Sequence, residues 1–86
     1  MLQRALREVD DALQVAWDGL DRTERIVAAA LADGHAPTGR VAGEHGVARS
    51  TLKKALDRLA DAQQHVIRDP EPRLLDPLFA EWLRRR

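Results

Sequence analysis

Apolar residues recur at spacings of three and four along the first twenty positions, which is the period of one face of an α-helix. The members of this stripe are Leu2, Leu6, Val9, Leu13, Ala16 or Trp17, and Leu20. The pattern predicts a helix of about 16 residues that Gly19 ends. The stripe packs on its own domain in the interpretation we favour. Because the spacing also suits a short coiled-coil seam, the alternative is a homodimer through Leu6, Val9 and Leu13.

A second helix is predicted to begin at residue 21. Asp21 stands three residues before Glu24, which is the spacing of a capping box with Asp at the N-cap. The apolar face of this helix comprises Ile26, Val27, Ala30 and Leu31. Gly34 and Pro37 follow it, and this order is typical of a helix C-terminus.

The segment 38–56 predicts a helix-turn-helix, in which two short helices meet at a tight turn. Thr38 is expected to cap the first of them. Gly39 and Gly43 would each weaken that helix by up to ~1 kcal/mol, so tertiary packing must hold it. Gly46 is expected to leave the helix in the left-handed conformation that glycine adopts at little cost.

The second helix of this pair is predicted to run from about residue 48 to about residue 63. Its inward residues would be Leu52, Ala55, Leu56 and Leu59. Ala48 is a poor N-cap, because it has no side-chain oxygen to accept a bond from the first backbone N–H groups. Those groups are left to water or to a ligand.

The last third of the chain predicts a small β-hairpin and a terminal helix. Residues 65–68 and 72–75 are β-prone runs on either side of an acidic, proline-containing tip. A hairpin directly behind such a helix is a wing. Asp76 and Pro77 then supply an N-cap and a first helical residue, and the apolar side of the last helix comprises Leu78, Phe79, Trp82 and Leu83. We expect all three aromatic residues, Trp17, Phe79 and Trp82, to form one cluster that joins the chain ends.

These elements together predict a mostly α fold, a winged helix-turn-helix with a short β-hairpin wing and with the N- and C-terminal helices packed together. With 86 residues the chain is expected to be one domain, 1–86. Its parts are an N-terminal helix (1–19), a three-helix core (20–64), the wing (65–75) and a C-terminal helix (76–86). No cysteine and no long apolar run occur, and we expect a soluble cytoplasmic protein.

The chain offers little for catalysis, and we expect a non-enzymatic module without cofactor or metal. His35, His45 and His65 do not have the spacing of a metal site, and there is no cysteine nucleophile. Ser50 and Thr51 are better explained as residues at the start of a helix.

Charge is distributed unevenly, although 14 basic and 14 acidic residues cancel. The segment 38–59 holds an excess of basic residues, whereas both flanks are acidic. The residues that we expect to contact DNA are the arginines, lysines and hydroxyl residues of this segment: Thr38, Arg40, Arg49, Ser50, Thr51, Lys53, Lys54 and Arg58. Three arginines, 84–86, form a second basic spot. We prefer to interpret it as the basic end of a helix rather than as a phosphate-binding site.

Three stretches, 17–20, 46–52 and 73–85, resemble the C-terminal winged-helix domain of AAA-type P-loop ATPases abundant in archaea and actinobacteria. Asp76-Pro77-Leu78-Phe79 is the most specific part, and the resemblance covers almost the whole chain. It implies the tail of a longer ATPase or a detached relative of that tail. Nucleotide binding is not implied, because the chain has no glycine-rich phosphate loop. Such domains usually turn from helix to wing through a glycine, where this chain has Gln63-Gln64-His65.

Two functions from different classes follow. In the first, the domain would bind duplex DNA, with the helix that starts near Arg49 in the major groove and with Arg40 or Thr38 in contact with the DNA backbone. Alternatively, it is a protein-interaction or regulatory module that docks on an ATPase core or a partner. The neutral net charge and acidic flanks favour the second function, and the local basic excess favours the first.

Overall fold

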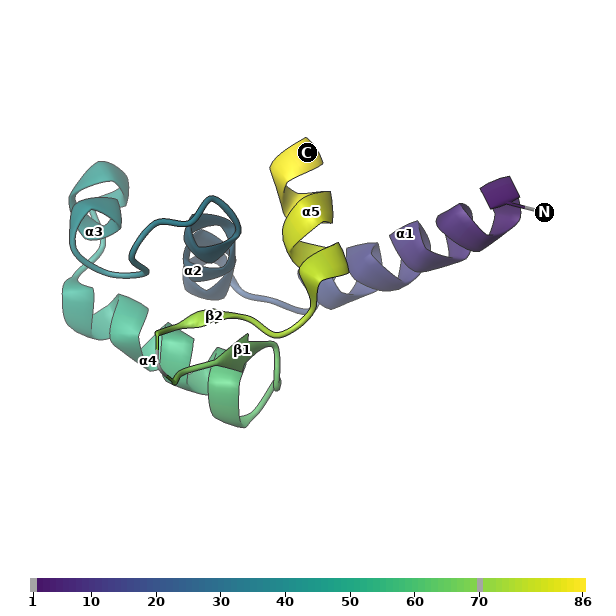
Figure 1. The fold of residues 1–86 in the computed structure, drawn as a ribbon. Helices are drawn as coiled ribbons and strands as arrows, with labels where there is room; N and C mark the ends of the chain where they lie inside the picture. Colours follow the sequence, from purple (N-terminus) through teal and green to yellow (C-terminus); the bar gives the residue numbers. More distant parts are fainter. Residues whose placement is uncertain (1, 70) are drawn as a thin grey trace.

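Helices and one small sheet form the structure, a computed structural model. It describes the backbone of residues 2–69 and 71–86 and the side chains of residues 9–69 and 71–86. In this part of the chain the elements are α1 (Leu2–Asp18), α2 (Arg22–Ala32), α3 (Arg40–His45), α4 (Arg49–Asp61), β1 (Val66–Ile67), β2 (Arg73–Leu74) and α5 (Pro77–Arg85). Figure 1 shows α2, α3, α4 and the sheet gathered at one end, while α1 projects from the other. The predicted mostly helical fold with a two-stranded antiparallel sheet is confirmed.

The hydrophobic core forms around α2, which packs against α4, α5 and β2. Val27 of α2 and Leu52 and Leu59 of α4 are completely buried. All four predicted inward residues of α4 are buried, so its helical period was predicted correctly. No helix in the described ranges is both long enough and apolar enough to cross a membrane.

Both predicted carboxylate caps are confirmed. Asp21 Oδ1 accepts a bond from the Glu24 N–H at 2.8 Å, and Glu24 Oε1 accepts one from the Asp21 N–H at 3.0 Å, which completes the capping box. Asp76 Oδ1 accepts a bond from the Leu78 N–H at 2.9 Å, and Pro77 is the first helical residue. These caps fix where α2 and α5 begin.

The prediction that Thr38 caps the next helix is wrong. The N-cap of α3 is Gly39, at φ 67° and ψ −116°, and no side chain bonds to this end. Glycine adopts such a positive φ without a steric penalty, so Gly39 turns the chain before the helix rather than weakening its interior. Gly46 has the predicted left-handed conformation, at φ 64° and ψ 32°, and joins α3 to α4.

The sheet is shorter than the β-prone runs of the sequence. Each strand has two residues, with Val66 opposite Leu74 and Ile67 opposite Arg73. Pro72 has no N–H with which to lengthen the pairing at one end. At the other end the Leu75 N–H donates to the His65 carbonyl at 2.8 Å.

The terminal helices meet through the aromatic cluster that the sequence predicts. The ring centroids of Trp17 and Trp82 are 6.4 Å apart in an edge-on arrangement, and those of Phe79 and Trp82 are 6.1 Å apart. The placement of Leu78 on the packed side of α5 was wrong, because 59% of this residue is exposed. Phe79 is the residue of α5 that enters the core.

Candidate nucleic-acid interface

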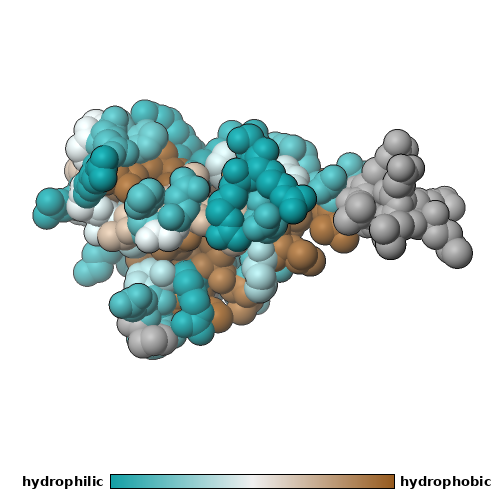
Figure 2. Space-filling view, turned by 45° about the horizontal axis from the view of Figure 1, so that its top comes forward, coloured by the Kyte–Doolittle hydropathy of each residue, from teal (hydrophilic) through white to brown (hydrophobic). Residues whose placement is uncertain are grey.

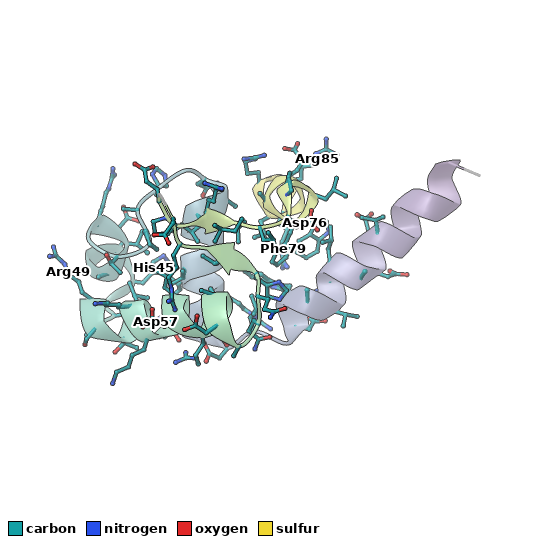
Figure 3. All side chains as sticks on the ribbon, turned by 60° about the horizontal axis from the view of Figure 1, so that its bottom comes forward. His45, Arg49, Asp57, Asp76, Phe79 and Arg85 are labelled. Carbon is teal, nitrogen blue, oxygen red and sulfur yellow. The ribbon has the colours of Figure 1, made fainter. Side chains whose placement is uncertain are left out.

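Five of the predicted DNA-binding residues lie together in the first two turns of α4. All five are exposed: Arg49, Ser50, Thr51, Lys53 and Lys54. Figure 3 shows Arg49 pointing away from the body at one extremity of the molecule. Since Leu52 and the other apolar residues of α4 face the core, the helical period directs this polar group outward.

The backbone at the start of α4 is open, as the alanine at position 48 predicts. Ala48 is the N-cap and gives no side-chain hydrogen bond, while its carbonyl accepts bonds from the N–H groups of Thr51 and Leu52 at 3.1 and 3.2 Å. The positive end of the helix dipole therefore faces solvent beside Arg49, and an anion there would be stabilised.

The predicted cations differ in whether they are already paired. Arg49, Lys53 and Lys54 form no ion pair with any carboxylate of the described residues. Arg40 on α3 pairs with Glu44, Nε to Oε1 at 2.9 Å, within its own helix. Three cations are therefore available to a ligand without breaking a contact.

Arg58, by contrast, joins α4 to the start of α2. One of its terminal nitrogens lies 3.1 Å from Asp21 Oδ2, and its Nε lies 3.8 Å from Glu24 Oε2. Glu24 is buried, and its Oε2 has no hydrogen-bond partner, so Arg58 supplies the nearest opposite charge. Burial alone would raise the pKa of Asp21, but the Glu24 N–H, the Thr23 hydroxyl and Arg58 together hold that pKa below its ordinary value.

Thr38 lies before α3 and not on α4. It is half-buried, and it is separated from the helix by Gly39. Of the eight predicted residues, the structure therefore brings five together on α4, places Thr38 and Arg40 at the neighbouring α3, and engages Arg58 in an interhelical contact.

The sequence analysis did not identify Arg68, which shapes the charge of the same helix. Its guanidinium lies 3.2 Å from Asp57 Oδ1 and 2.5 Å from Asp61 Oδ2. The hydrogen bond to Asp61 and the attraction of the nearby carboxylates raise the pKa of Arg68 above its ordinary value. Arg68 directly follows β1, so only the folded hairpin brings it against the acidic second half of α4.

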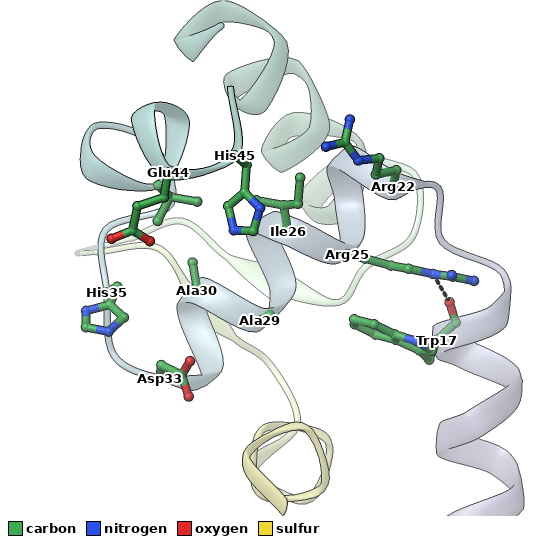
Figure 4. Close-up of a pocket in the computed structure, with 11 residues that line it drawn as sticks. Trp17, Arg22, Arg25, Ile26, Ala29, Ala30, Asp33, His35, Glu44 and His45 are labelled. Atoms are coloured by element: carbon green, nitrogen blue, oxygen red, sulfur yellow. Dashed lines mark hydrogen bonds between the residues drawn. The ribbon is translucent and has the colours of Figure 1, made fainter. Parts of the chain in front are cut away.

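An open groove of about 390 Å³ lies between α2, α3 and the end of α1 (Figure 4). Ile26 and Ala29 form part of its floor, and Arg25 is held at its edge by a bond from Nε to the Trp17 carbonyl at 3.2 Å. His35 and His45 line it. Among the residues that the structure describes, no group of three or more His, Asp or Glu side chains could hold a metal ion.

Comparisons of this chain with protein-family models, with curated proteins and with solved structures gave no match. The charges and caps of α4 are thus the observations from which a function is inferred.

Proposed function

We propose that this chain is a winged-helix domain that binds duplex DNA with the first two turns of α4 in the major groove. The observation that carries the proposal is the group of three exposed, unpaired cations, Arg49, Lys53 and Lys54, beside the uncapped start of that helix. In helix-turn-helix proteins the N-terminal residues of the second helix contact base edges. Ser50 and Thr51 add hydroxyl donors for phosphates or bases.

The hairpin contributes little to DNA contact in this proposal. It has two residues in each strand, and Arg68, which follows β1, is engaged by Asp57 and Asp61. With three unpaired cations, we expect weak binding whose affinity falls with salt at a logarithmic slope of about −3.

The resemblance to the tails of AAA-type ATPases suggests where such a domain acts. We propose that it is the non-enzymatic, DNA-contacting module of an ATPase of that kind. The motif Asp76-Pro77-Leu78-Phe79 supports this assignment, and in this chain it starts α5 and anchors it in the core through Phe79.

Fluorescence anisotropy with mixed-sequence duplex DNA, between about 50 and 200 mM salt, tests the DNA proposal. The double variant Lys53→Glu, Lys54→Glu should abolish detectable binding, whereas Lys53→Arg, Lys54→Arg should retain it because the charge is kept. Absence of binding at low salt, or equal binding by the charge-reversed double variant, would contradict the proposal.

A protein-docking module is the second candidate function, and the exposed apolar residues of the terminal helices favour it. Leu78 and Val9 are 59% and 38% exposed, on elements other than the basic helix. A salt-insensitive complex with a separately produced ATPase core, unchanged by Lys53→Glu, Lys54→Glu, would support docking. Failure to associate with that core would count against it.

A further inference from the structure

Helix α1 is packed at one end only. Its last turn meets α5 through Trp17 and Trp82, and Leu13 is partly buried against the core. Val9 is 38% exposed, and Figure 1 shows the helix continuing beyond α5 toward its N-terminus. A helix of this length has only marginal stability in water unless its apolar face is packed. Contact with a partner would therefore stabilise the projecting part.

The exposed apolar surface of α1 continues onto α5. A groove of about 270 Å³ between the two helices is lined by Val9, Leu13, Leu78 and Trp82, with charged side chains at its rim. Figure 2 shows hydrophobic surface at the base of the projecting helix. In the sequence Leu2 and Leu6 extend the Val9 and Leu13 stripe at the same period. The side chain of Leu6, which the sequence analysis placed in a dimer seam, lies outside the described residues.

The charges along α1 distinguish between the partners that could cover this surface. Arg4, Arg7 and Glu8 give its first half a net charge of +1, whereas Asp10, Asp11 and Asp18 give its second half a net charge of −3. A membrane-surface helix would have a polar face rich in Lys and Arg, which the acidic second half does not provide. A second α1 in antiparallel orientation would set each basic half level with an acidic half and would also oppose the two helix dipoles.

We propose that two copies of this chain associate through their α1 helices, antiparallel, with Val9 and Leu13 of each copy in the seam and Leu78 of α5 at its edge. The interface is self-complementary, as a two-fold dimer requires. The apolar stripe supplies the contact area, and the charges outside it select the antiparallel orientation. This association does not depend on DNA binding.

Sedimentation equilibrium of the whole chain, from micromolar to millimolar concentration, tests the proposal. The chain should dimerise, and Val9→Glu or Leu78→Glu should each raise the dimer dissociation constant more than about tenfold, because a two-fold interface is changed twice. Val15→Glu is the matched control: Val15 lies on the same helix, is 72% exposed and is not in the groove, so this variant should dimerise normally. Circular dichroism should show all three variants folded, since each replaces an exposed side chain.

Disulfide trapping tests the orientation, because the chain has no cysteine of its own. A mixture of the variants Val9→Cys and Leu13→Cys should give the cross-linked heterodimer, since an antiparallel seam centred between these two residues brings the two positions level. Cross-linking of Val9→Cys to itself instead would contradict the antiparallel orientation. A chain that stays monomeric at millimolar concentration, or a dimer that Val9→Glu and Leu78→Glu leave intact, would overturn the proposal.

Discussion

The two ends of the molecule use their cations differently. At the end formed by the start of α4, Arg49, Lys53 and Lys54 are exposed, and no carboxylate of the described residues pairs with them. At the end formed by α1 and α5, the three arginines 84–86 contact other groups of the same chain. Basic composition alone therefore does not distinguish the two ends, whereas the pairing of each charge does.

Each of the three arginines 84–86 has at least one contact within the chain. Arg84 donates to the Ala32 carbonyl at 3.0 Å and to Glu81 at 2.7 Å, and Arg85 also pairs with Glu81. The hydrogen bonds from Arg84 and Arg85 lower the pKa of Glu81 below its ordinary value. Arg86 lies over the rings of Trp17 and Trp82, with centroid distances of 4.7 and 5.1 Å. The helix-end interpretation of this triplet agrees with these contacts.

The largest expected effect contrasts a buried leucine of α4 with an exposed leucine of α5. Leu52→Ala should lower the free energy of unfolding by about 2–5 kcal/mol, because it opens a cavity in the core. Leu78→Ala, at a residue that is 59% exposed, should change it by less than about 0.5 kcal/mol. Urea unfolding at micromolar concentration measures both. Similar losses would show that α5 is packed more tightly than its exposure indicates.

The next prediction separates a structural cation from an available one on the same helix. Arg58→Ala should lower the free energy of unfolding by about 1 kcal/mol, because it leaves the buried Glu24 without its nearest cation. Lys54→Ala should leave stability almost unchanged and weaken DNA binding more. Urea unfolding and anisotropy on both variants give the comparison. The reverse order in DNA binding would move the interface toward Arg58.

Local patterns were sufficient to predict the helices and their caps. The caps at Asp21 and Asp76 depend on residues within three positions of each other, so they can be predicted from local spacing alone. The prediction of Thr38 as a cap failed because Gly39 is the N-cap instead. Its positive φ follows from the path of the chain, which the N-cap preferences of residue types do not describe. Long-range pairs could not be predicted: Arg58 and Asp21 are 37 residues apart, and Arg68 reaches α4 only through the hairpin.

The turn between α4 and the hairpin carries a smaller expected effect. Gln64 has φ 56°, a left-handed conformation at the place where the resembled family usually has a glycine. Gln64→Gly should therefore raise the free energy of unfolding, by up to about 1 kcal/mol. Gln63→Gly is the matched control and should lower it, because Gln63 has no positive φ and glycine adds chain entropy to the unfolded state. Thermal unfolding of the two variants distinguishes them, and stabilisation by both would contradict the assignment.

The smallest expected effect is the pH dependence of the joint between α2 and α4. The pKa of Asp21 is lower in the fold than its ordinary 3.8, so its contribution to stability is fully present above that value and is lost as pH falls through the folded pKa. Asp21→Asn keeps an N-cap side chain but does not titrate. The native chain should therefore be more stable than Asp21→Asn at pH 7, and the difference should shrink below about pH 4. Urea unfolding along this pH range measures the difference, and a difference that stays constant into acid would show that the Asp21 carboxylate is not the linked group.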